Sequence, residues 1–350
     1  MAIVLLDRTI IPEISLYCPI VGTHKLWPHS AITQVAFFLT LKLSAVVPGA
    51  IKSQGDSCQI RQFRHTDFST SVSPVVLVDH FVMTGPAFGP HSHAGISAAT
   101  LLLDDSTGVL QNLEGAADSR DIRAGDLYWA QTGRGLVHAQ RPVGEARLHG
   151  LQIFMDLPGD LKSQSPSTSL LRTAQIPVIQ SPSGRIRVVS GQHGESESPL
   201  RTPAPLLILD GQLRPGATTL VPLRPGWNAW ITAIHGDLGV RARHCRRGAS
   251  PLPKVAGGDP DFAVVRTGWA VAATAQPDGE EGVLLLMAGC APSHFVLIAG
   301  PAVDLPAAGQ GMPAQQGLAS LEQALAAYQA EEAQAQAEIQ AELEREDAAA

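Results

Sequence analysis

The sequence is poor in cysteine. Its 350 residues include only four, Cys18, Cys58, Cys245 and Cys290, which lie far apart and form no Cys-x-x-Cys motif. This spacing excludes a zinc cluster and a disulfide framework as the basis of the fold. We therefore expect free thiols in a reducing compartment, which favours a cytoplasmic protein.

Basic residues are not in excess, and long hydrophobic runs are missing. The net charge is -7 at pH 7, and seven acidic residues against one arginine lie between Glu331 and Asp347, so the rest of the chain is almost neutral. A direct nucleic-acid binder normally shows a basic face, so we expect no direct contact with nucleic acid. The apolar stretch at residues 36–50 is interrupted by Lys42, is too short to span a membrane, and follows no compact basic segment of a signal peptide.

Two stretches show the rhythm of an all-β protein. From Gln59 to Met155, and again from Leu206 to Gly300, short aliphatic or β-branched runs alternate with Gly, Asp and Pro turns. This rhythm is typical of barrels and sandwiches. We expect an N-terminal extension (1–56) that is poorly ordered or accessory, followed by a first barrel (57–157). A crossover segment (158–200) then leads to a second barrel (201–317) and to a C-terminal helix with an acidic tail (318–350).

Two short motifs carry the chemistry. They are His91-Ser-His93 and, far downstream, His138-Ala-Gln140. In a β-strand, residues two apart point to the same face, so two neighbouring strands with such pairs can converge four ligand atoms on one ion. Imidazoles suit iron, copper, nickel or zinc. The alternative is a barrel that has lost its metal and kept its packing, because alternating histidines also arise on exposed strands.

Other polar and aromatic residues are predicted to be structural. His149, His235 and His294 have no paired partner at strand spacing, so we expect ordinary core, turn or strand histidines. Tyr128 and Trp129 are neighbours in a predicted strand, so only one of them can face the barrel interior.

These motifs resemble the two metal motifs of the pirin family, which are bicupin proteins of the cupin superfamily. The first motif is matched by Pro90 to Gly95, and the second by Gly125 to Trp129, Gly133 to Gly135, and His138-Ala139. The likeness runs from about Gln59 to about Tyr328. It implies two cupin barrels in tandem, jelly-roll-like and followed by a C-terminal helix, with a metal in the first barrel only.

The resemblance also implies the ligands and the ion. His91, His93, His138 and Gln140 would hold one divalent transition metal, iron first, with nickel, copper, zinc and manganese as the alternatives. The chain departs from the family at two positions: Gln140 stands where the family has a glutamate, and Ala94 where it has an arginine. A glutamine carbonyl can bind a metal, but it is uncharged and cannot act as a base.

Three functions remain open at this stage. The first is an oxidoreductase resembling quercetin 2,3-dioxygenase, acting on a small aromatic, flavonol-like substrate. The second is a non-catalytic protein, responsive to metal or redox state, that binds a protein partner such as a transcription factor or a metabolic enzyme. The third is a degenerate cupin scaffold without metal. The three histidines favour a bound metal, whereas Gln140 favours the two non-catalytic hypotheses.

Overall fold

The computed structural model describes residues 41–85, 88–114, 118–244, 261–279 and 281–303. Within these ranges the chain is almost entirely strand, which confirms the all-β prediction. The helices there are single 3-10 turns, η1 (His65–Asp67), η2 (Gly159–Leu161) and η3 (Thr173–Gln175). None of the helices in the described ranges has the length and hydrophobicity needed to cross a membrane. The predicted C-terminal helix lies outside the described residues.

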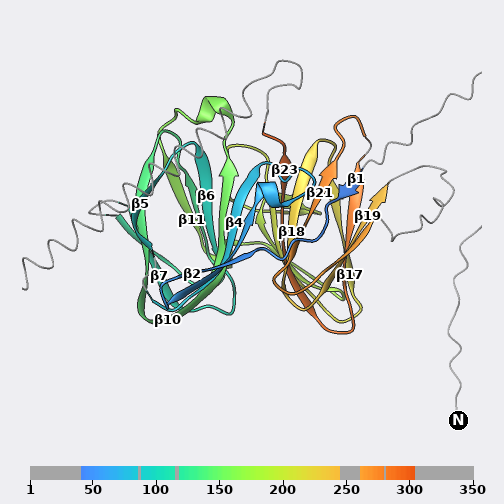
Figure 1. Ribbon diagram of the computed structural model, residues 1–350, viewed down its shortest axis with the longest axis horizontal. Helices are drawn as coiled ribbons and strands as arrows, with labels where there is room; N and C mark the ends of the chain where they lie inside the picture. Colours follow the sequence, from blue (N-terminus) through green and yellow to red (C-terminus); the bar gives the residue numbers. More distant parts are fainter. Residues whose placement is uncertain (1–40, 86–87, 115–117, 245–260, 280, 304–350) are drawn as a thin grey trace, which may run out of the picture. The chain divides into compact units, whose positions relative to one another are not determined.

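The first barrel is a ten-stranded sheet that folds back on itself through one long strand. The first half of that strand pairs with β5 and β7, and its second half pairs with β4 and β6, so it joins both layers of the barrel (Figure 1). The strands are β2 (Ala50–Gln54), β3 (Cys58–Arg64), β4 (Val75–Met83), β5 (Phe88–His93), β6 (Ile96–Leu102), β7 (Thr107–Glu114), β8 (Asp118–Ile122), β9 (Leu127–Gln131), the long β10 (Leu136–Asp156) and β11 (Ser167–Leu171).

The second barrel consists of a seven-stranded sheet and a four-stranded sheet, with a small two-stranded hairpin beside them. Together with the first barrel, it confirms the predicted tandem arrangement. The larger sheet contains β1 (Leu41–Leu43), β12 (Val178–Ser181), β13 (Gly184–Ser190), β16 (Leu207–Leu213), β18 (Trp227–His235), β21 (Ala270–Ala275) and β23 (Ser293–Pro301). The smaller sheet contains β17 (Thr218–Leu223), β19 (Leu238–His244), β20 (Phe262–Val265) and β22 (Gly282–Ala288), and the hairpin contains β14 (Gln192–His193) and β15 (Ser196–Glu197).

The end of the predicted N-terminal extension is part of the fold. We expected accessory sequence up to residue 56, but β1 pairs with β21 of the second barrel and β2 pairs with β3 of the first. Leu41 is fully buried, whereas the next residue, Lys42, is exposed. This alternation is the period of a strand with one face on a core. The segment was missed because the run was interpreted as a broken apolar stretch, and residues 1–40 lie outside the described residues.

The interiors of the two barrels differ in character. The second barrel is filled by a hydrophobic cluster that includes Ala229 and Ile231 of β18. This strand begins within the Gly226-Trp227-Asn228 segment, which stands in place of the histidine motif. The first barrel has a smaller hydrophobic cluster and also buries polar side chains, among them Thr100 and Asn112. Buried polar groups are costly unless they are hydrogen-bonded, so this polar interior marks the first barrel as the one with a site.

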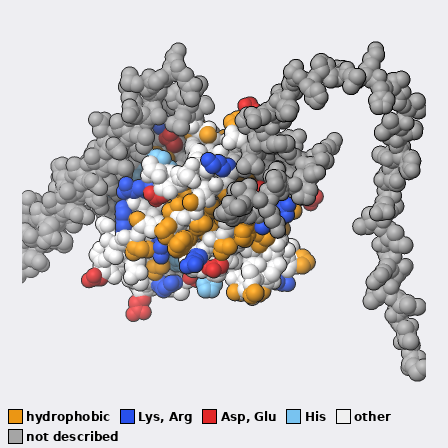
Figure 2. All heavy atoms as spheres, turned by 45° about the vertical axis from the view of Figure 1, so that its right-hand side comes forward, with side chains coloured by type: hydrophobic (Ala, Val, Ile, Leu, Met, Phe, Trp, Pro, Cys, Tyr) orange, Lys and Arg blue, Asp and Glu red, His pale blue; other side chains and the backbone are white. Residues whose placement is uncertain are grey.

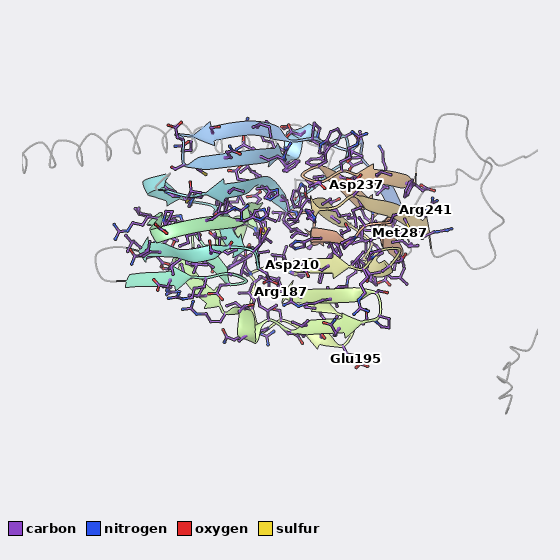
Figure 3. All side chains as sticks on the ribbon, turned by 90° about the horizontal axis from the view of Figure 1, so that it is seen from below. Arg187, Glu195, Asp210, Asp237, Arg241 and Met287 are labelled. Carbon is purple, nitrogen blue, oxygen red and sulfur yellow. The ribbon has the colours of Figure 1, made fainter. Side chains whose placement is uncertain are left out.

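Hydrophobic and polar contacts join the first barrel to the second. The Phe63 and Trp230 rings meet edge to face with centroids 5.5 Å apart. Beside them, the guanidinium of Arg187 donates to Asp210 at 2.8 Å and to the carbonyl of Gly125 across the interface. Arg187 and Asp210 lie between the two groups of strands (Figure 3) and are 1% and 3% exposed. The surface is mixed in charge: on the face shown in Figure 2, basic and acidic side chains are interspersed with hydrophobic ones.

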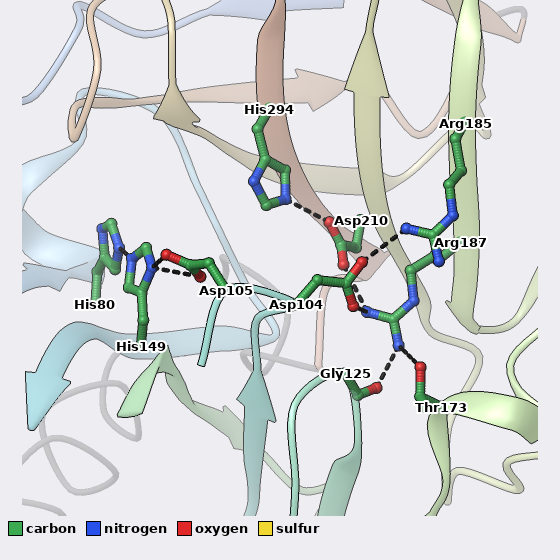
Figure 4. A network of polar contacts seen from close by, with 10 residues as sticks. All are labelled: His80, Asp104, Asp105, Gly125, His149, Thr173, Arg185, Arg187, Asp210 and His294. Carbon is green, nitrogen blue, oxygen red and sulfur yellow. Dashed lines mark hydrogen bonds and ion pairs between the residues drawn. The ribbon is translucent and has the colours of Figure 1, made fainter. Parts of the chain in front are cut away.

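A second polar chain lies on the same side of the first barrel (Figure 4). His80 and His149 lie on the neighbouring strands β4 and β10, and their Nε2 atoms are 2.7 Å apart. Nδ1 of His149 is hydrogen-bonded to the Asp105 carboxylate at 2.8 Å. His149 is thus a hydrogen-bonded structural histidine, as expected from the sequence. Burial, and then the neighbouring His149, Arg61 and His294, lower the pKa of His80 to about 3, although Asp105 acts in the opposite direction.

The low pKa of His80 predicts that acid destabilises the fold. Below pH ~6.5 the unfolded chain protonates this histidine, whereas the folded chain does not. The contribution of His80 to the free energy of unfolding is therefore complete above pH ~6.5 and is lost as pH falls toward 3. At pH 5 the share of the loss that His80 causes should be about 2 kcal/mol relative to pH 7. Urea unfolding at both pH values would measure it, with His80→Gln showing a smaller pH dependence. Equal pH dependence in both proteins would contradict the assignment.

Candidate metal centre

Strand register brings the three motif histidines together. His91 and His93 alternate along β5 and therefore share one face, and His138 of β10 is paired directly with His91 across the ladder. Gln140 follows two residues later, beyond a bulge, and is paired with Asn112 of β7 on the other side. His138 and Gln140 are 2% and 8% exposed, so the face on which they lie is the barrel interior.

The ring nitrogens converge at distances that suit a metal. One nitrogen from each of His91, His93 and His138 lies within 4.8 Å of the others. Among the residues that the structure describes, these three side chains form a cluster close enough to hold a metal ion. Nε2 of His91 and Nε2 of His138 are 3.1 Å apart. Two metal–nitrogen bonds of about 2.1 Å at a right angle would separate their nitrogens by roughly 3.0 Å. The donor set and its spacing therefore fit a divalent transition metal.

The amide of Gln140 is held by two neighbours. Its Nε2 donates to Asn112 Oδ1 at 3.0 Å and to Thr100 Oγ1 at 3.1 Å. The single Thr100 hydroxyl proton is already donated to Gln152 at 2.6 Å, so toward Gln140 the hydroxyl acts as an acceptor. Both N–H groups of Gln140 are thereby engaged, which leaves its carbonyl oxygen as the atom able to serve as a fourth ligand.

Burial keeps His93 and His138 neutral. It lowers the pKa of His93 to about 3, with a further contribution from His91, and lowers the pKa of His138 to about 2, with contributions from His91 and His93. Neutral imidazole is the form that binds a metal, so near pH 7 a metal need not displace a proton from either residue.

Aromatic rings line the site beside the histidines. The ring centroids of His93 and Phe154 are 5.3 Å apart, and those of His138 and Tyr128 are 6.1 Å apart. Tyr128 therefore faces the interior, and Trp129 packs into the cluster between the barrels.

The Gly-Asp pair of the second motif is structural. The buried Asp126 carboxylate accepts hydrogen bonds from the backbone N–H groups of Arg123 and Thr173 and from the Arg172 guanidinium. Gly125 has φ +79°, and a Cβ at this position would lie 2.5 Å from the Thr173 hydroxyl. A residue with a side chain would be strained there. The motif thus fixes the turn before β9 and leaves ligand binding to the histidines.

Sequence reasoning missed Asn112. It is fully buried, and its Oδ1 lies 3.0 Å from Nδ1 of His138 as well as bonding Gln140. The only sequence signal was period-2 alternation in β7, because Asn112 shares a face with the buried Leu110. Nothing in a single sequence shows that this face lies beside β10, so the contact required the strand pairing.

The comparisons with known proteins agree with this fold and site. The Pirin family model matches residues 49–155, which span β2 to β9 and almost all of β10. Human pirin is 27% identical over 266 residues, which cover 76% of this chain and 84% of that protein.

Two solved structures share the fold. A quercetin 2,3-dioxygenase from Acinetobacter baumannii superposes with TM-score 0.58 and 18% identity, covering 81% of this chain and 95% of its own. The bacterial pirin YhhW from Escherichia coli, solved in complex with nickel(II), superposes with TM-score 0.52 and 16% identity over 75% of this chain and all of its own. The family model and the similarity to human pirin thus identify residues 49–155, the first barrel, as a pirin-family cupin domain.

Proposed function

We propose that the first barrel binds one divalent transition metal through His91, His93 and His138, with the Gln140 carbonyl as fourth ligand. The observation that carries the proposal is the convergence of three imidazoles in a polar barrel interior, where burial lowers the pKa of His93 and of His138. Iron is the ion proposed first, and the nickel(II) complex of YhhW supports a divalent first-row metal of this kind. The second barrel, with its hydrophobic interior, serves as a structural partner.

We further propose that the site serves an oxygenase reaction on a flavonol-like substrate at low turnover. The structural likeness to quercetin 2,3-dioxygenase supports this reaction class. A bound divalent ion would supply Lewis-acid activation and a path for electrons. The chain's own contribution is orientation and exclusion of water, because Gln140 cannot accept the substrate's hydroxyl proton as a glutamate would.

Metal analysis tests the binding proposal. Protein purified without chelators should contain about one transition-metal ion per chain, and His93→Ala or His138→Ala should lose most of it, since each removes one of three converging ligands. His235→Ala is the matched control, because His235 is exposed at the end of β18 in the second barrel. Inductively coupled plasma mass spectrometry would give the metal content of all four proteins.

The results separate the remaining hypotheses. Negligible metal in the native protein and in every variant would support the metal-free scaffold instead. Metal lost equally in His138→Ala and His235→Ala would place the ion elsewhere. Metal bound as proposed, but with no oxygen uptake on any flavonol by the native protein or the Gln140→Glu variant, would favour a regulatory protein that binds a protein partner.

A further inference from the structure

Glu114, at the end of β7, is the carboxylate that connects to the histidine site. It accepts hydrogen bonds from Tyr128 Oη at 2.7 Å, from Asn112 Nδ2 at 2.9 Å and from Thr168 Oγ1 at 3.0 Å. Glu114 and Asn112 are two residues apart on one strand and so share a face. All three neighbours donate, as a carboxylate requires, because it offers only acceptor atoms. Burial and then Glu114 raise the pKa of Tyr128, which keeps the phenol protonated as a donor.

This acceptor decides which way the Asn112 amide points. The two ends of an asparagine amide have nearly the same shape, so the hydrogen-bond network determines its orientation. Because Glu114 can only accept, Nδ2 of Asn112 must face it, and Oδ1 must then face His138 and Gln140. Asn112 is fully buried, so the reverse orientation would set its carbonyl oxygen against a carboxylate with no water to compensate.

The orientation of Asn112 in turn fixes both neighbouring ligands. Nδ1 of His138, 3.0 Å from Oδ1 of Asn112, must carry the ring proton, which leaves a bare lone pair on Nε2 toward His91. Nε2 of Gln140 must donate to the same oxygen of Asn112. The carbonyl oxygen of Gln140 then points away from Asn112 and is available as a ligand. Oxygen acceptors that hold the second nitrogen of a ligand histidine set its tautomer in this way.

We infer that Glu114 is a positioning residue that selects, through Asn112, the donor atoms His138 Nε2 and Gln140 Oε1 of the metal site. Position 140 carries no carboxylate, and the Glu114 carboxylate lies two hydrogen bonds from His138 and Gln140, through Asn112. The selection of tautomer and amide orientation is a property of the metal-free chain. Its consequence for metal affinity rests on the proposed metal-binding function.

The first test is spectroscopic and uses the metal-free protein. In the full chain with ¹⁵N-labelled histidine, the His138 signals, assigned by their loss in His138→Gln, should show the Nδ1–H tautomer. Glu114→Gln is almost the same shape but can turn either end toward Asn112, so a substantial share of the Nε2–H tautomer should appear. Tyr128→Phe removes a different partner of Glu114 and should leave the tautomer unchanged.

An exchange of groups provides the rescue. The double variant Glu114→Gln with Asn112→Asp moves the acceptor-only group next to His138 and Gln140, so the Nδ1–H tautomer should return. Nickel(II) titration should follow the spectra, with a Kd weakened about 10–100-fold in Glu114→Gln and recovered in the double variant. Should the single variant not fold, retention of the Nδ1–H form by the double variant still tests the argument.

The outcomes distinguish the two proposals. An unchanged tautomer in Glu114→Gln, or a double variant that stays in the Nε2–H form, overturns the role of Glu114. A tautomer that shifts and recovers as described, in proteins that bind no nickel(II) at all, supports that role and overturns the metal-binding function.

Discussion

The Gln140→Glu variant should oxidise quercetin about 10²–10⁴-fold faster than the native protein, because it regains a base next to the substrate's hydroxyl group. The native glutamine can offer its carbonyl to a metal, but both its N–H groups are donated to Asn112 and Thr100, and it cannot take up a proton. Oxygen uptake on iron-, nickel- and copper-loaded protein would measure the rates. Each rate should be divided by the metal content, since an anionic ligand also strengthens metal retention.

A matched control separates the base from a general effect of charge. Gln111 lies next to Asn112 on β7 but faces outward, where it accepts a hydrogen bond from Arg141. Gln111→Glu introduces the same charge near the barrel without placing it among the histidines, and should leave turnover unchanged. Fast native turnover that Gln140→Glu does not alter would show that no base is needed at position 140.

The Arg187→Met variant should lower the free energy of unfolding by about 3–5 kcal/mol, because it leaves the buried Asp210 carboxylate without its guanidinium partner. Arg187 is 1% exposed and donates to Asp210, to the Gly125 carbonyl and to the Thr173 hydroxyl, so it joins elements of both barrels (Figure 4). Burial alone would raise the pKa of Asp210, but His294 and Arg187 together hold it below its usual value.

Chemical denaturation measures this effect against an exposed ion pair. Arg201, whose side chain is 83% exposed, bonds Glu197 at 3.1 Å, and Arg201→Met should cost at most about 1 kcal/mol. The double variant Arg187→Met with Asp210→Leu should be less destabilised than Arg187→Met alone, because no buried charge remains unpaired. Equal losses in Arg187→Met and Arg201→Met would show that the buried hydrogen bonds of Arg187 do not stabilise the fold.

The sequence was sufficient to predict the tandem β architecture and the convergence of the histidines. The tandem architecture follows from the two stretches of short runs and turns and from the resemblance to pirins. Period-2 alternation puts His91 and His93 on one face of a strand and identifies His138 as the second strand's contribution. The resemblance to pirins supplied the pairing of those strands. The polar interior of the first barrel then follows from the need to satisfy buried histidines.

What could not be predicted depends on pairing between distant segments. Asn112 and Glu114 look like ordinary strand residues until β7 is paired with β10, and Leu41 looks like part of a broken apolar run until β1 is paired with β21. His294 was predicted to be an ordinary strand histidine, yet its Nε2 lies 2.6 Å from Asp210 in the network between the barrels. Such contacts arise from tertiary geometry, and local sequence patterns carry no record of them.

The most direct measurement is anomalous X-ray scattering from crystals of the full chain loaded with nickel(II). We expect one strong peak per chain, inside the first barrel, about 2.1 Å from one nitrogen each of His91, His93 and His138 and from the carbonyl oxygen of Gln140. A peak at a surface histidine such as His235, or a first barrel without a peak in nickel-loaded crystals, would contradict the account.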